Sequence, residues 1–396
     1  TSYISQTVID GSQAGSVVSF HTNENTAAKI IGITITNGLS STGGGVQCVG
    51  TSPRIEHCYI QNNSAGQGGG IFIDGGDPIV QDNHITNNIE TQGDQNAGGI
   101  FITNGGGGIV IRNTITNNSG IGLGSGIEAY VPSDLIIREN IISGNSSAGE
   151  NGGITVWYDG THQLEITNNL IYQNSSIGIW IVAGNGGGSL NVFHNTIYDN
   201  AGDGISFNGT YDILSLKNNI ITDNGGYGIS ATGTNYPDNN FNCVSGNGLS
   251  NYHFIPAGEN DTNANPFFHH PTLGDFELLD WSPCIGAGDP SVLIINDLAT
   301  NVRPNPAGSS PDIGAYENPL GTPQHMPITI NIPDDYATIQ AGLNAADSTD
   351  TVLVQPGTYA ENIIWPETNG IKLLSAGDTS NTIIDGGGNS SVIAIN

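Results

Sequence analysis

Charged side chains recur at one position of a repeated segment and could carry chemistry there. In one repeat Glu139 occupies this position, and Arg138 directly precedes it. Alternating charges in a stack of repeats indicate a ladder of surface ion pairs, each of which contributes little to stability. The alternative is a catalytic centre made from Arg112 or Arg138 together with Asp82 and Glu139. The position is occupied in turn by His57, Asp82, Arg112, Glu139, Asn168, His194 and Asn218.

A second set of positions combines aromatic rings with carboxylates. In two sets of equivalent positions, whose side chains are expected to point outward, Asp74 and Glu128 stand among aromatic residues. Rings stack on the C–H faces of sugars while acids accept their hydroxyl groups, so this face predicts a carbohydrate-binding platform. The alternative is that a loop or a neighbouring chain covers the strip. The pair Asp74 and Glu128 also gives a weak signal for a glycosidase, which needs two nearby carboxylates. The rings are Phe72, Phe101, Tyr130, Trp157 and Trp180.

The elements that must position these residues form a regular repeat. Two asparagines, five residues apart, return every 23 to 30 residues, by subtraction of successive positions between Asn63 and Asn247. Between them run short segments with a period of two, rich in β-branched residues and bounded by Gly, Asn and Asp. Such a period indicates a solenoid, and strands of this kind indicate a parallel β-helix with coils stacked at about 4.8 Å.

The asparagine columns follow from this stacking. An inward amide can donate to one neighbouring coil and accept from the other, so a column of amides satisfies itself. Glycine columns mark positions where a Cβ would clash or where φ is positive. Cys48 and Cys58 fall at inward positions, and Cys58 takes an asparagine slot. Cys243 and Cys284 are expected in later, irregular coils, either as free thiols or as a disulfide.

Composition narrows the function classes. Seven Lys and Arg residues face 36 Asp and Glu residues, which gives a net charge of −29. This balance argues against nucleic acid and anionic membranes as partners, and the sequence contains no run of 18 apolar residues for membrane insertion. The acidity suits a secreted or cell-surface protein. It also makes Ca²⁺ the one cofactor that the sequence suggests, without indicating a metal site.

The repeat ends before the chain does. We expect the β-helix over residues 1–318, without an N-terminal cap and with irregular closing coils from about residue 248. A Pro- and Gly-rich linker follows at 319–327. Residues 328–396 predict a helix that begins at Asp334 or Asp335 and buries Ile339 and Leu343, followed by a strand at 351–354.

These later segments resemble a known family. Residues 350–359 and 361–363, after a helix, resemble the N-terminal cap of secreted bacterial pectin-lyase-like right-handed β-helix proteins, while 282–291 and 312–318 resemble the close of such a module. The resemblance covers nearly the whole chain and is specific for fold but not for activity. In lyases of this kind an Arg or Lys removes a proton beside a uronate carboxylate that Ca²⁺ neutralises, and Arg112 or Arg138 could imitate it.

One early coil occurs twice in the sequence. A β-helix without a cap exposes unpaired strand edges, so we expect the copy near the C-terminus of one chain to stack on the N-terminal coil of the next. The alternatives are a window cut from a tandem array and, less favoured, an engineered permutant. The matching residues are Thr7, Val8, Ile9, Asp10, Val17 and Val18 with Thr382, Ile383, Ile384, Asp385, Val392 and Ile393.

Together these observations predict an all-β protein with a helix-capped C-terminal segment. The leading interpretation is an extracellular structural or adhesive module that binds polysaccharide and stacks end to end with further copies of itself. The alternative is a polysaccharide lyase or glycoside hydrolase that acts on an acidic or plant or algal polysaccharide.

Overall fold

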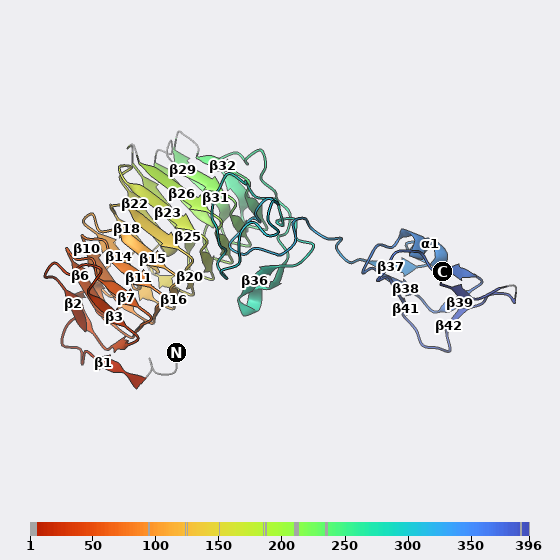
Figure 1. Ribbon diagram of the computed structural model, residues 1–396, viewed down its shortest axis with the longest axis horizontal. Coiled ribbons are helices and arrows are strands. Elements are labelled where there is room, and N and C mark those ends of the chain that lie inside the picture. The colour runs from red at the N-terminus through yellow and green to blue at the C-terminus, as the bar shows by residue number, and fades with distance from the viewer. Residues whose placement is uncertain are drawn as a thin grey trace. The chain divides into compact units, whose positions relative to one another are not determined.

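The computed structural model describes residues 6–93, 96–122, 124, 126–149, 151–184, 186, 188–209, 214–233, 237–388 and 390–395. The chain divides into two compact units, residues 1–323 and 324–396. The first unit is a stack of coils in which strands follow one another from β2 to β31 along the axis (Figure 1). The strands of these coils pair in parallel, each with the equivalent strand one coil away, as the repeat predicts.

Each coil passes through three long sheets. The first sheet contains β1 (Val8–Asp10), β4 (Thr34–Thr36), β8 (Tyr59–Gln61), β12 (His84–Thr86), β16 (Thr114–Thr116), β20 (Ile141–Ser143), β24 (Leu170–Tyr172), β27 (Thr196–Tyr198), β30 (Ile220–Thr222) and β33 (Cys243–Ser245). The second sheet contains β2 (Val18–Phe20), β6 (Val46–Val49), β10 (Ile71–Asp74), β14 (Ile100–Thr103), β18 (Ile127–Tyr130), β22 (Asn151–Tyr158), β25 (Ile177–Ala183), β28 (Ile205–Gly209), β31 (Tyr227–Gly233) and β34 (Ser250–His253).

The remaining strands of the coils form two further sheets. The third sheet contains β3 (Lys29–Ile31), β7 (Arg54–Glu56), β11 (Ile79–Gln81), β15 (Gly108–Ile111), β19 (Leu135–Arg138), β23 (Gln163–Thr167), β26 (Ser189–Phe193), β29 (Leu214–Lys217) and β32 (Asp238–Asn240). A short fourth sheet between the first and second sheets contains β5 (Leu39–Thr42), β9 (Ser64–Gln67), β13 (Ile89–Glu90), β17 (Ser119–Gly120) and β21 (Ser146–Ser147).

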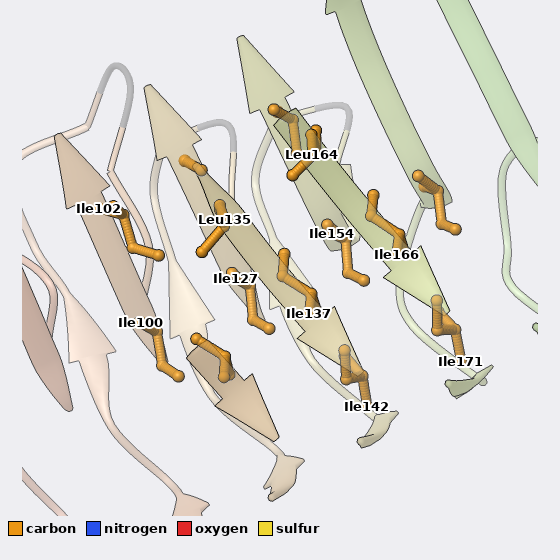
Figure 2. Close-up of a cluster of buried hydrophobic side chains, with 14 of the residues drawn as sticks. Ile100, Ile102, Ile127, Leu135, Ile137, Ile142, Ile154, Leu164, Ile166 and Ile171 are labelled. Carbon is orange, nitrogen blue, oxygen red and sulfur yellow. The ribbon is translucent and has the colours of Figure 1, made fainter. Parts of the chain in front are cut away.

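Aliphatic side chains fill the inside of the coils. Residues at equivalent positions lie above one another, as Ile100, Ile127 and Ile154 do in Figure 2, and all three are fully buried. Ile137 and Ile166 continue the same core from the third sheet. Each coil therefore covers the apolar interior of the next one, and the core is continuous along the stack.

The asparagine columns lie at the two turns that flank the first sheet, and they confirm the predicted ladders. Asn83 Nδ2 donates to Asn113 Oδ1 at 3.0 Å, and Asn113 Nδ2 donates to Asn140 Oδ1 at the same distance. The second column repeats this arrangement from Asn63 to Asn88 and Asn118. The backbone N–H of Cys58 donates to Asn83 Oδ1, so Cys58 occupies an asparagine slot as expected.

Close approach between coils and positive φ make demands at different columns of the repeat. Gly126 belongs to a column in which a Cβ would meet the next coil, here the Gly153 carbonyl oxygen at 2.5 Å. Its column requires glycine because of close approach. The residue before each ladder asparagine has positive φ instead, as in Asp82 with φ 55° and Arg112 with φ 52°. The charged column of the sequence is therefore a column of left-handed turn residues.

The segment after β34 leaves the coils and covers the outside of the first sheet. Residues expected as irregular closing coils form a hairpin of β35 (Phe268–His270) and β36 (Asp275–Leu278), joined by the 3₁₀ helix η2 (Pro271–Leu273). A second core forms there, in which Phe276 packs against Tyr172 and Tyr198. Cys284 belongs to this covering segment rather than to a coil, and all four cysteines are buried with free thiols.

The second unit has a small core of its own. Its α-helix α1 (Ile339–Ala345) buries Ile339 and Leu343, as predicted, but the cap is Thr338 and not Asp334 or Asp335. The Thr338 hydroxyl accepts from the backbone N–H of Ala341 at 3.1 Å. The strands are β37 (Thr329–Ile332), β38 (Thr351–Val354), β39 (Gly357–Tyr359), β40 (Ile363–Ile364), β41 (Lys372–Ser375), β42 (Thr382–Ile384) and β43 (Ile393–Ala394).

Candidate functional site

The predicted aromatic face lies on the outside of the second sheet, and its register agrees with the sequence. Phe72, Phe101, Glu128, Thr155 and Trp180 are direct neighbours on successive strands. Two residues further along, Asp74 pairs with Thr103 and Tyr130 pairs with Trp157. Parallel stacking thus brings the predicted platform residues onto one face.

The prediction that this face is exposed to solvent is wrong for three of its residues. Phe72 and Phe101 are only 4% and 3% exposed, and Glu128 is fully buried. The two phenylalanines form a small cluster with Ala97, which belongs to the long connection between β13 and β14. A loop of the same chain therefore covers this half of the strip, which is the alternative that the sequence left open.

The other half of the strip remains accessible. The Tyr130 side chain is exposed, and Trp157 and Trp180 are half-buried. Their rings are in contact in a row, with centroids 6.2 Å apart for Tyr130 and Trp157 and 5.2 Å apart for Trp157 and Trp180. A row of rings at this spacing offers successive stacking surfaces on one side of the sheet.

A cavity of about 500 Å³ opens beside Tyr130, which we call the aromatic pocket. Phe72 and Phe101 line it together with Asp74, whose Oδ1 accepts from Asn104 Nδ2 at 2.7 Å. Amide side chains also line the pocket, and the sequence prediction missed those of Gln92, Asn96 and Asn104 because these residues lie outside the strands. The polar lining also includes Thr42, Gln47, Gln67, Gln92, Asn96, Thr103 and Asn104.

Several buried polar atoms next to the aromatic pocket make no hydrogen bond of normal geometry in the described part of the chain, although Trp157 and the Asn96 and Gly124 backbone lie close enough to Glu128 to lower the pKa of its carboxyl. They are both carboxylate oxygens of Glu128, Oγ1 of Thr155, Nε1 of Trp157 and Oδ1 of Asn96. Burial raises the pKa of the Glu128 carboxyl to about 8, the Trp157 indole opposes this rise, and the charge of Glu90 adds to it. Glu128 is therefore a largely protonated acid at neutral pH.

Glu90 is buried on the same side of the coils but is fully engaged. Its carboxylate accepts from the backbone N–H groups of Gly93 at 2.6 Å, of Ile121 and Gly122 at 3.0 Å each, and of Gln92. This carboxylate fixes the loop that carries Asn96 and lines the aromatic pocket. Glu90 was not predicted as a site residue, because it stands at the end of a short strand outside the two outward columns.

The charged column lies on a different edge of the β-helix, between the third and first sheets. Arg112 donates to Asp82 at 2.8 Å and lies 3.6 Å from Glu139, while Arg138 lies 3.4 Å from Glu139. The ion pair raises the pKa of Arg112 and lowers that of Asp82. These four catalytic candidates are therefore brought together as a chain of ion pairs, and Glu128, on the second sheet, does not belong to this group.

A second cavity, of about 470 Å³, adjoins this ladder. Arg112, Arg138 and Glu139 form one side, and residues 293–296 of the covering segment form the other. Further along, the same segment encloses the column, so that His194 and Asn218 are fully buried. Asn218 Oδ1 accepts there from the backbone N–H of Asp289 at 2.7 Å.

The covering segment is attached through a buried charge cluster that the sequence did not reveal. Arg303 contacts His194 and lies 3.2 Å from the Glu317 carboxylate, with both side chains almost completely buried. Burial lowers the pKa of Arg303 to about 10 and raises that of Asp312 to about 7. The contact between Arg303 and His194 joins residues far apart in sequence, so no local pattern could have indicated it.

The comparisons with known proteins identify the fold. The family described as the right handed beta helix region matches residues 2–187 and 165–260. The chain belongs to this family. The expected all-β, right-handed parallel β-helix is thereby confirmed, whereas the secreted and pectin-lyase-like character stays a prediction. Neither a curated protein nor a solved structure matches the chain.

Two further expectations can be compared with the described residues. In that part of the chain, no group of three or more His, Cys, Asp or Glu side chains is placed to hold a metal ion, and the Ca²⁺ expectation stays a prediction. No helix among the described residues is long and apolar enough to cross a membrane.

Proposed function

We propose that this β-helix is a carbohydrate-binding module and that its ligand occupies the aromatic pocket. The observation that carries the proposal is the lining of this pocket, where the exposed Tyr130 ring, one carboxylate and several amides border a cavity of about 500 Å³, and the rings of Phe72 and Phe101 complete the lining although they are almost completely buried. Rings supply stacking surfaces for the apolar faces of sugars, and amides and carboxylates exchange hydrogen bonds with their hydroxyl groups.

The neighbouring ring row extends this surface. A saccharide bound beside Tyr130 would meet Trp157 and then Trp180, whose ring centroids lie 5.2 Å apart. We therefore propose that the bound ligand is an oligosaccharide or polysaccharide whose chain continues from the pocket onto these rings. An extracellular location, which the acidic composition favours, gives the module access to such polymers.

The test is glycan-array binding followed by titration of the best ligand against the wild type and three variants. Tyr130→Ala should weaken binding at least about tenfold. The Trp157→Ala, Trp180→Ala double variant should abolish the increase in affinity that longer oligosaccharides show over shorter ones. Tyr336→Ala is the matched control, because Tyr336 is 40% exposed and lies in the second unit. Equal losses in Tyr130→Ala and Tyr336→Ala would contradict the proposal.

A second proposal is that copies of the chain associate end to end. Apolar residues of β1 and β42 are exposed, with Ile9 at 39% and Ile383 at 45%. Each of these strands has one described parallel neighbour, β4 and β39 respectively, so each keeps a free edge among the described residues. The near-identical runs at 7–10 and 382–385 support stacking with like side chains in register. Residues 1–5 of the first coil lie outside the described part.

Association can be measured by light scattering over a range of protein concentrations. Ile383→Lys should shift the protein to the monomer because it places a charge on the stacking edge. Leu293→Lys is the control, since Leu293 is 86% exposed on the covering segment and should leave association unchanged. A wild-type protein that stays monomeric at the highest concentration would contradict the proposal.

A further inference from the structure

Among the described residues that line the aromatic pocket, Asp74 is the one carboxylate. Its carboxylate has no ion-pair partner among the described residues, and Oδ1 is held by the Asn104 amide at 2.7 Å. Neither a lysine, an arginine nor a histidine lines the cavity in the described part of the chain. A carboxylate held in this way, with free acceptor capacity, favours a cationic partner.

An unpaired acceptor also faces the aromatic pocket. Asn96 lines the cavity, and its buried Oδ1 has no described hydrogen-bond donor. A buried acceptor without a donor favours a ligand that brings an N–H group to it.

The aromatic lining of the pocket also favours a cationic ligand. Phe72 and Phe101 line the pocket but are only 4% and 3% exposed, so Tyr130, 36% exposed, presents the accessible ring. The negative face of such a ring attracts cations as well as C–H groups. The chain as a whole, with a net charge of −29, draws cationic polymers toward itself and repels polyanions.

We propose that the glycan bound in the aromatic pocket carries unacylated amino groups, and that the ammonium group of one sugar pairs with Asp74. This inference rests on the proposed carbohydrate-binding function and names the class of its ligand. Asp74 is then the residue that determines specificity, because it attracts a sugar ammonium and repels the carboxylate of a uronate or the sulfate of a sulfated sugar. The rings and amides bind the remainder of the sugar in either case.

The test compares three oligosaccharides of equal length by isothermal titration at physiological salt: a β-1,4-linked glucosamine oligomer, its fully N-acetylated form and a galacturonate oligomer. The glucosamine oligomer should bind about five- to tenfold more tightly than the acetylated form, and the galacturonate oligomer should bind most weakly. Asp74→Asn should remove the preference for the free amine while it leaves binding of the acetylated oligomer nearly unchanged.

Asp134→Asn controls for non-specific attraction between the acidic protein and a polycation. The Asp134 side chain is 74% exposed and lies outside the aromatic pocket. If Asp134→Asn lowers glucosamine binding as much as Asp74→Asn does, the attraction is non-specific and the inference is wrong. Equal affinity for the amine and the acetylated oligomer would overturn the inference but leave the proposed function intact. If the wild-type protein bound none of the three oligosaccharides, both the inference and the proposed function would be overturned.

Discussion

The asparagine columns and the outer face of the second sheet both bury polar side chains, but the buried groups are hydrogen-bonded to one another only in the asparagine columns. Asn118 Oδ1 accepts from Asn88 Nδ2, and Asn118 Nδ2 donates to Asn145 Oδ1, each at 3.0 Å. Glu128, equally buried, has neither oxygen in a hydrogen bond of normal geometry among the described residues, although the nearby Trp157 indole lowers the pKa of its carboxyl. A column of identical amides satisfies itself because the next coil supplies the missing partner. A carboxyl group in a column with Phe101 and Thr155 has no such neighbour, so it depends on its proton, on water or on a ligand.

The largest effect is expected from breaking a ladder in its middle. Asn118→Ala removes the amide on which Asn88 and Asn145 depend and leaves buried donors and acceptors unpaired. The free energy of unfolding should fall by about 2–4 kcal/mol, as measured by urea denaturation. Asn208→Ala, on the exposed outer side of β28, is the control and should change it by less than about 0.5 kcal/mol. A loss below about 1 kcal/mol in Asn118→Ala would show that the ladders contribute little.

A smaller effect, with a defined pH dependence, is expected from Glu128. Its pKa is about 8 in the folded protein and near 4.5 when unfolded, so the folded state holds the proton more strongly. The resulting stabilisation is complete below about pH 4.5 and is lost as the pH rises toward 8. Glu128→Gln should therefore flatten the fall in unfolding free energy between pH 5 and pH 8, by on the order of 1–3 kcal/mol.

Denaturation of both proteins at these two pH values gives the measurement. Asp134→Asn serves as the control, because that side chain is 74% exposed and its substitution removes a carboxylate without altering the buried site of Glu128. Parallel profiles for wild type and Glu128→Gln would mean that Glu128 is already ionised at pH 5.

The smallest effect is expected at the charged column. Arg112 is 36% exposed in its side chain and pairs with Asp82 and Glu139, which are less exposed. Arg112→Ala should lower the free energy of unfolding by less than about 1 kcal/mol, since half-exposed ion pairs contribute little. If the protein degrades a polyuronate in the presence of Ca²⁺ and Arg112→Ala abolishes that activity, the column is a lyase site and the present assignment of the ligand face is wrong.

The sequence predicts most of the fold, because each stacking rule acts between residues one repeat apart. Asn83 and Asn113, or Phe72 and Phe101, can be paired by counting alone, and the register agrees. The candidate site is predicted only in part. Counting assigns Phe72 and Glu128 to the outside of the sheet, but it cannot tell that the connection carrying Asn96 and Ala97 folds over them.

The contacts of the covering segment could not be predicted from the sequence for the same reason. Arg303 and Glu317 meet each other within that segment, but the contact of Arg303 with His194 spans more than a hundred residues. Contacts of this kind lie outside any repeat. Burial of Asn168, His194 and Asn218 under this segment therefore could not be predicted, although their places in the column could.

The most direct test of the account is hydrogen–deuterium exchange of the whole chain with and without a saturating glycan ligand chosen from the array. The account predicts that the ligand slows exchange in β10, β14 and β18 and in the loop around Asn96, which together surround the aromatic pocket. The turns at Arg112 and Glu139 should exchange at unchanged rates. Protection confined to those turns and to residues 293–296 would contradict the account and assign the ligand to the charged column.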